Sequence, residues 1–116
     1  MRLRACAVAE DVLPLFEVAY PDDPGPRNAI LTARRFVSGE ATGEELDTAG
    51  ALASFSTSVA VREKQHAAIA ASAAAGATCS LEDDYALSVA LSCAAYARQE
   101  HYVEYQQERE RLACLT

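Results

Sequence analysis

A proline-rich acidic turn separates two apolar helical segments near the start of this 116-residue chain. The turn reads YPDDPGPR over residues 20–27, and a residue that precedes proline is driven out of the helical region of backbone space. The segment before the turn, VLPLFE, contains Pro14, whose ring displaces a backbone carbonyl about one turn earlier in a helix. We therefore predict two helices that meet at a rigid turn, with a kink at Pro14 or a helix that restarts near Asp11.

Helix signals also fill the rest of the first half, and few windows alternate with period two as strands do. The first helix is expected over about residues 3–19, and the second from the acidic turn to about residue 37. Asp23 is the expected cap of the second helix, because an aspartate oxygen accepts hydrogen bonds from the first amides. Ser38-Gly39 is a typical helix end, with glycine in a left-handed cap.

The second half of the chain is harder to divide into elements. Thr42-Gly43-Glu44-Glu45 fits a capping box that opens a third helix. Residues 43–75 form either one helix or two, because serine and threonine weaken the middle of this segment. Residues 76–79 are expected to form a turn, after which Ser80 caps a long final helix. The sequence thus predicts an all-α fold, a compact bundle of four to six helices with a long C-terminal helix, in one domain over residues 1–116.

The final helix has two unlike halves. From Tyr85 to Ala97 it is apolar almost all round and carries no charge, which predicts a central, buried element. After Arg98 it turns polar, and only a few apolar residues continue the stripe. We expect this end to project from the bundle or to lean on a partner, and a homo-oligomer through the C-terminal helix is one such arrangement.

The stretch from Cys6 to Glu40 also resembles part of a known family. VLPLFE is followed there by a PDD turn, an arginine before an Ala-Ile pair, and a Gly-Glu helix end. This series is similar to the small all-helical putative immunity proteins of bacterial polymorphic toxin systems, and the good match covers about residues 5–40. The resemblance implies a small helical protein that binds a protein toxin and neutralises it.

The net charge of −7 limits the kinds of partner. Binding to nucleic acid by phosphate neutralisation needs a basic face, so we expect no nucleic-acid partner, and anionic membrane surfaces are disfavoured too. An acidic surface speeds the encounter with a basic protein, and a nuclease toxin would be such a partner. The other interpretation is that the charge only keeps a small protein in solution.

Two acidic clusters are the candidate partner-binding residues. Asp22 and Asp23 lie on the proline-stiffened turn, where little conformational entropy is lost on binding. Glu82, Asp83 and Asp84 lie at the start of the final helix. Both clusters also have a purely structural interpretation as helix caps, because aspartate is a preferred cap residue.

Cysteine and histidine spacing favours neither a metal nor a cofactor. The four cysteines, Cys6, Cys79, Cys93 and Cys114, lie far apart without a CxxC pair, so we expect buried, reduced thiols, and a disulfide framework is the alternative. Glu63 and His66 match half of a di-iron motif whose second half is missing. No apolar run reaches the roughly 18 residues that span a bilayer, and acidic residues interrupt the N-terminal apolar stretch, so we expect a cytoplasmic protein.

The chain lacks GxGxxG, P-loop and GxSxG motifs, which favours a binding protein over an enzyme. The alternative function is a small helical-bundle enzyme or ligand-binding protein. Its pocket would be lined by Tyr85, Tyr96 and His101 on the final helix. A third class is an oligomeric scaffold whose last helix pairs with itself.

Overall fold

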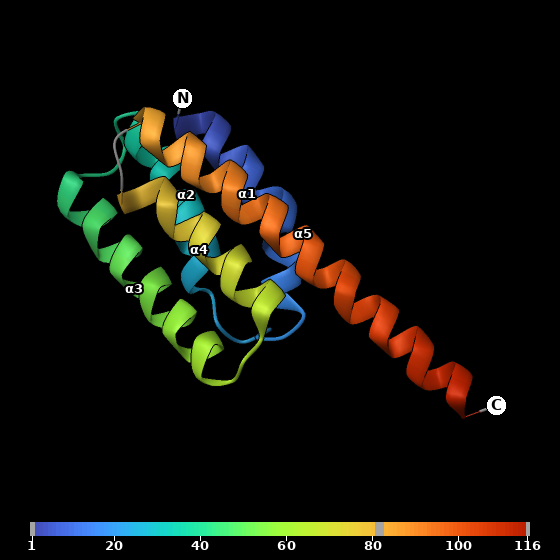
Figure 1. Ribbon diagram of the computed structural model, residues 1–116. Helices are drawn as coiled ribbons and strands as arrows, with labels where there is room; N and C mark the ends of the chain where they lie inside the picture. The colour runs from blue at the N-terminus through green and yellow to red at the C-terminus, as the bar shows by residue number, and fades with distance from the viewer. Residues whose placement is uncertain (1, 81–82, 116) are drawn as a thin grey trace.

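The computed structural model describes residues 2–80 and 83–115, which form an all-helical bundle (Figure 1). Within these residues there are five helices and no strand: α1 (Arg2–Glu17), α2 (Gly25–Val37), α3 (Gly43–Arg62), α4 (His66–Ser80) and α5 (Asp83–Cys114). The all-α prediction with a long C-terminal helix is confirmed. No helix in this described part is long and apolar enough to cross a membrane.

The central helix is α4, which packs against α1, α2, α3 and α5. Apart from Ile69, its side chains from Ala67 to Cys79 are small, and most of them are buried. Small residues on a helix surface let neighbouring helix axes approach closely, so one short helix can contact all the others. Ser72 adds a polar contact within this core, with its hydroxyl oxygen 2.8 Å from that of Thr57 on α3.

The prediction that the uncharged part of α5 is a central, buried element is wrong. Among the described residues, α5 packs against α1 and α4 only, and it buries a stripe of alanines there, Ala86, Ala90, Ala94 and Ala97. Tyr85, Leu91 and Tyr96 on its other sides are 65%, 52% and 49% exposed. The composition of this segment is apolar, but it packs against the bundle mainly through its alanines, with Leu87 and Cys93 partly buried beside them.

The second half of α5 extends beyond the rest of the molecule, as Figure 1 shows. The described residues from Arg98 onward are exposed or half-buried. The principal-axis extents of 56 × 24 × 17 Å reflect this projection. A 32-residue helix is about 48 Å long, roughly twice the width of this bundle.

α1 runs without a break through Pro14, so the predicted restart near Asp11 is wrong. Pro14 lies on the exposed side of the helix, where water can hydrate the Glu10 carbonyl that receives no amide from proline. The opposite side of α1 is buried, with Val12 and Phe16 in the main core. Its burial holds the helix together across the proline.

Residues 43–75 form two helices, which the sequence left open. α3 ends at Arg62, and Lys64 adopts the left-handed conformation with φ of 57°, so the chain reverses into α4. The capping box at the start of α3 is confirmed: the Glu45 amide donates to Thr42 Oγ1 at 3.1 Å, and the Thr42 amide donates to Glu45 Oε1 at 3.1 Å.

The predicted turn at residues 76–79 is wrong, because α4 continues through it to Ser80. Ser80 is therefore the last residue of α4. Gly76 faces α3, and a β-carbon there would lie 3.7 Å from the Ala53 β-carbon. Thr78 and Cys79 are buried, so packing keeps this segment helical where local signals favoured a turn.

Candidate functional site

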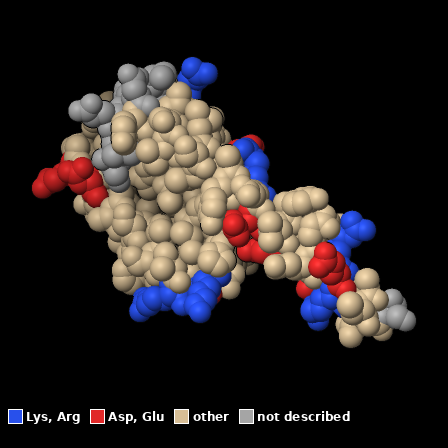
Figure 2. All heavy atoms as spheres, viewed as in Figure 1, with Lys and Arg blue, Asp and Glu red and all other residues tan. Residues whose placement is uncertain are grey.

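A dense group of carboxylates that the sequence analysis did not single out lies at the start of α3. Glu40, Glu44, Glu45 and Asp47 are four acids within eight residues, and all are exposed. Figure 2 shows Asp and Glu atoms gathered at the end of the molecule where α3 begins. Within the described residues, the guanidinium of Arg35 reaches this cluster, 4.0 Å from Glu45 Oε2 and 3.0 Å from the Glu40 carbonyl. We call these four residues the α3 acidic cluster.

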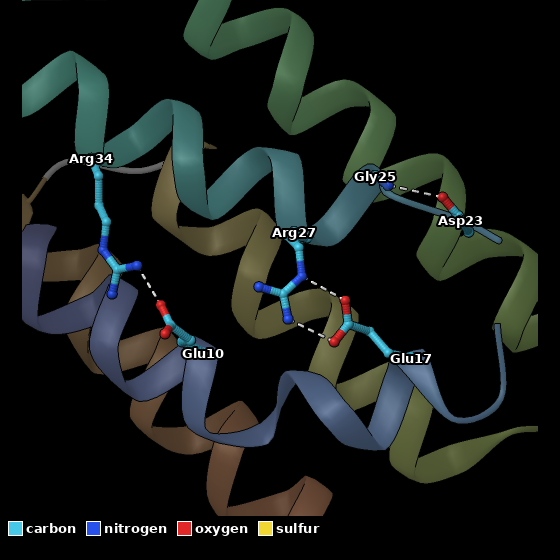
Figure 3. Close-up of polar contacts among 6 residues, drawn as sticks. All are labelled: Glu10, Glu17, Asp23, Gly25, Arg27 and Arg34. Carbon is cyan, nitrogen blue, oxygen red and sulfur yellow. Dashed lines mark hydrogen bonds and ion pairs between the residues drawn. The ribbon is translucent and has the colours of Figure 1, made fainter. Parts of the chain in front are cut away.

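The carboxylates of α1, in contrast, are paired with arginines (Figure 3). The Arg27 guanidinium donates to both oxygens of Glu17 at 2.7 Å, and this pairing holds the pKa of Glu17 below its usual value. Arg34 donates to Glu10. These side chains are well exposed, so the pairs add little stability, but they neutralise this face of the molecule.

Arg98 extends the same pattern to α5. Its guanidinium donates to Asp11 Oδ2 at 2.7 Å, which joins the last helix to α1 across 87 residues of sequence. Three of the ten Lys and Arg residues therefore form ion pairs with carboxylates of α1. The negative charge that remains for a partner lies away from α1.

The two aspartates of the acidic turn differ in exposure and in their contacts. The Gly25 amide donates to Asp23 Oδ1 at 2.9 Å (Figure 3), so Asp23 is half-buried and helps to start α2. The N-cap position itself is occupied by Pro24, one residue later than predicted, and Pro24 has no side-chain capping bond. Asp22 is exposed, so its carboxylate is accessible to a partner.

The second predicted acidic cluster can be placed only in part. Glu82 lies outside the described residues. Asp83 and Asp84 form the beginning of α5, and their side chains also lie outside what the structure describes.

A hollow of about 670 Å³ lies between α2 and α3, and we call it the α2–α3 groove. Its lining residues are Gly25, Asn28, Leu31, Thr32, Arg35, Thr42, Glu44, Glu45, Thr48, Ala49 and Leu52. Leu31, Ala49 and Leu52 supply apolar surface, whereas Glu44 and Glu45 belong to the α3 acidic cluster. An apolar centre with a polar rim is typical of surfaces that bind proteins.

The three residues of the alternative pocket do not share a hollow. Tyr85 and Tyr96 lie about 16 Å apart along α5, and His101 lies about 140° around the helix axis from Tyr96. His101 lines a smaller hollow of about 310 Å³ with Glu104 and residues of α1 and α4, and neither tyrosine lines it. The charge of Glu100 and a hydrogen bond to it raise the pKa of the exposed Tyr96 hydroxyl, which makes this hydroxyl a weaker acid.

Sequence reasoning missed both the α3 acidic cluster and the groove. The four acids within residues 40–47 were a usable signal, but Thr42 and Glu45 were interpreted only as a capping box. The groove had no comparable signal, because its two walls come from different helices. Across residues 2–80 and 83–115, no group of three or more His, Cys, Asp or Glu side chains is arranged to hold a metal ion.

Comparison with known proteins gives one informative result. The chain matches none of the curated proteins and none of the solved structures with which it was compared. The family model for the Imm-5 like putative immunity protein matches residues 3–113, well beyond residues 5–40, where the sequence resemblance was concentrated. Because this match covers most of the chain, the protein belongs to the Imm-5 like putative immunity protein family.

Proposed function

We propose that this protein binds a protein toxin and neutralises it by occluding the toxin's working surface. The observation that carries the proposal is the family match over residues 3–113. The surface is compatible with this role, because the α2–α3 groove joins apolar area to a rim of carboxylates. Such a surface suits recognition of a protein better than that of a small metabolite.

The finer proposal is that the toxin is basic, as a nuclease would be. The net charge is −7, and arginines already neutralise the carboxylates of α1. The α3 acidic cluster and the turn at Asp22 and Asp23 remain to attract a basic surface. Glu82, Asp83 and Asp84 stay proposed contacts of the same kind. Complementary charge raises the rate of encounter more than it raises affinity.

The proposed place of action is the cytoplasm. All four cysteines are free thiols, and Cys6 and Cys79 are buried in the core. Unpaired thiols in a small domain are typical of proteins kept in a reducing compartment.

Coexpression with a candidate toxin domain, taken from a gene that neighbours the gene for this chain, tests the proposal. The toxin alone should arrest growth, coexpression should restore it, and the two purified proteins should form a stable complex. Continued arrest in cells that contain the folded protein would reject neutralisation. If the toxin degrades nucleic acid, adding the chain should stop the cleavage, whereas the chain alone should not bind the nucleic acid. A toxin that is neutralised but cleaves no nucleic acid would reject the nuclease proposal only.

A further inference from the structure

The outer side of α3 has an unusual composition for an exposed helix. Residues 48–61 read TAGALASFSTSVAV and contain no charged side chain. Leu52 and Phe55 are 55% and 65% exposed, three residues apart on neighbouring positions of the helix surface. Surface helices normally carry charged residues on the side away from the core, so this side of α3 is suited to contact with another apolar surface.

The α2–α3 groove continues this apolar surface onto α2. Leu31 is 47% exposed and lines the groove opposite Ala49 and Leu52. A groove between two helices runs along their axes, and an amphipathic helix can lay its apolar side into such a groove. The two leucines are the side chains that would contact it.

Charge is distributed unequally along the groove. Glu44 and Glu45 line it where α3 begins, and Glu40 and Asp47 lie close to them in the sequence. Arg35, the one cation among the lining residues, lies at this same end and offsets only part of the charge of these four acids. An occupant with basic residues at one end would therefore be drawn to one orientation, with its basic end over the start of α3.

We infer that the α2–α3 groove binds an amphipathic helix of the toxin, whose apolar residues contact Leu31 and Leu52 and whose lysine or arginine residues lie over the α3 acidic cluster. This inference rests on the proposed function and adds the surface, the chemistry of the partner segment and its orientation. It also separates two contributions. The leucines mainly set the rate at which the complex dissociates, and the acids mainly set the rate at which it forms.

A pair of matched leucine variants tests the apolar contribution. Leu52→Glu places a charge in the groove, and Leu91→Glu places the same charge on α5, at a leucine of similar exposure, 52%. Leu52→Glu should weaken binding of the toxin domain by about 30-fold or more, as expected for the centre of an interface, mainly through faster dissociation. Leu91→Glu should change it by less than about threefold. Circular dichroism and thermal unfolding establish that both variants fold.

A second pair of variants tests whether the α3 acidic cluster attracts the basic end of the bound helix. Glu44→Gln combined with Asp47→Asn removes two charges from the α3 acidic cluster and leaves the capping box intact. Glu104→Gln combined with Glu110→Gln removes two charges from the projecting half of α5. Association at low salt should slow several-fold for the first pair and little for the second, and the difference should shrink as salt rises. Hydrogen exchange of the unmodified protein should show new protection in α2 and α3 when the toxin domain binds.

The outcomes separate this inference from the proposed function. If the unmodified chain binds the toxin domain tightly but Leu52→Glu binds equally well, the groove is not the site and neutralisation stands. New protection confined to α1 or α5 would overturn the groove in the same way. If the unmodified chain does not bind the toxin domain at all, both proposals are wrong.

Discussion

Gly25 and Ser56 bring α2 and α3 into close contact, because a β-carbon on Gly25 would lie 2.6 Å from the Ser56 hydroxyl oxygen. The same β-carbon would lie 3.1 Å from Asp23 Oδ1 and 3.3 Å from the Leu52 carbonyl. Glycine is therefore required here by the distance between two helices. Gly25 also lines the α2–α3 groove, so this contact sets how closely the two walls of the groove approach each other at that end.

The first prediction concerns this contact. Gly25→Ala should lower the free energy of unfolding by about 1–3 kcal/mol, because an extra carbon is forced into a closely packed site. Gly43→Ala is the matched control, since nothing lies within 4 Å of its β-carbon position, and it should change stability by less than about 1 kcal/mol. Urea denaturation measures both. Adding Ser56→Ala to Gly25→Ala should recover part of the loss, and no recovery would mean that Asp23 Oδ1 and the Leu52 carbonyl are the main obstacles.

The second prediction concerns Tyr20, whose hydroxyl donates to Glu63 Oε1 at 2.6 Å. Burial and then the Glu63 carboxylate raise the pKa of Tyr20 to about 12, from an ordinary value near 10. The unfolded chain thus loses this proton at lower pH than the folded one. The stability linked to Tyr20 should be fully present below about pH 10 and fall as pH rises toward 12.

Ultraviolet titration of tyrosinate checks this, with Tyr20→Phe used to isolate the contribution of Tyr20. Glu63→Gln should lower the pKa of Tyr20 part of the way, because burial remains. An unchanged titration in Glu63→Gln would mean that the hydrogen bond between Tyr20 and Glu63 does not affect the pKa of Tyr20.

The third prediction concerns the thiols. Burial raises the pKa of Cys6, Cys79 and Cys93, which lowers their thiolate fraction at neutral pH, whereas Cys114 is exposed near the end of α5. One thiol should react quickly with a maleimide under native conditions, and Cys114→Ser should remove this fast phase. Intact-mass analysis should show four reduced cysteines. A fast phase that survives in Cys114→Ser would contradict the burial of Cys6 and Cys79 or the partial burial of Cys93.

The fourth prediction concerns the acidic turn. Replacing Asp22 and Asp23 with asparagine keeps the oxygen that accepts from the Gly25 amide but removes two charges. Stability should change by less than about 1 kcal/mol, because asparagine caps nearly as well as aspartate. Association with the toxin domain should slow at low salt, and the effect should shrink at high salt. An unchanged association rate would leave these aspartates with a structural role alone.

The fifth prediction concerns the projecting half of α5. Its described local contacts include the Arg111–Glu108 ion pair at 2.6 Å and the Arg109 guanidinium 5.9 Å from the centre of the Tyr105 ring, and such exposed contacts add little stability. Backbone amides of residues 99–113 should therefore exchange with solvent much faster than those of α4. Slow exchange that becomes faster on dilution would instead indicate a homo-oligomer through the C-terminal helix.

The boundaries of the helices that begin or end with local signals were predictable from the sequence. The acidic turn, the Ser38-Gly39 end and the Thr42–Glu45 capping box all act over a few residues, so their effect can be evaluated without knowing the fold. The break between α3 and α4 was not predictable, because residues 51–75 contain neither glycine nor proline. There the chain turns at Lys64, a residue type with no turn preference.

The tertiary structure alone decided which helix is central and which charges remain for a partner. The apolar composition of residues 85–97 suggested a buried helix, yet the smaller side chains of α4 allow it to contact all four other helices. Likewise, the sequence gives the number of carboxylates but not that Arg98 neutralises Asp11 or that Arg27 neutralises Glu17. Packing and charge pairing depend on distances between residues far apart in the chain, and only the folded arrangement of the helices fixes those distances.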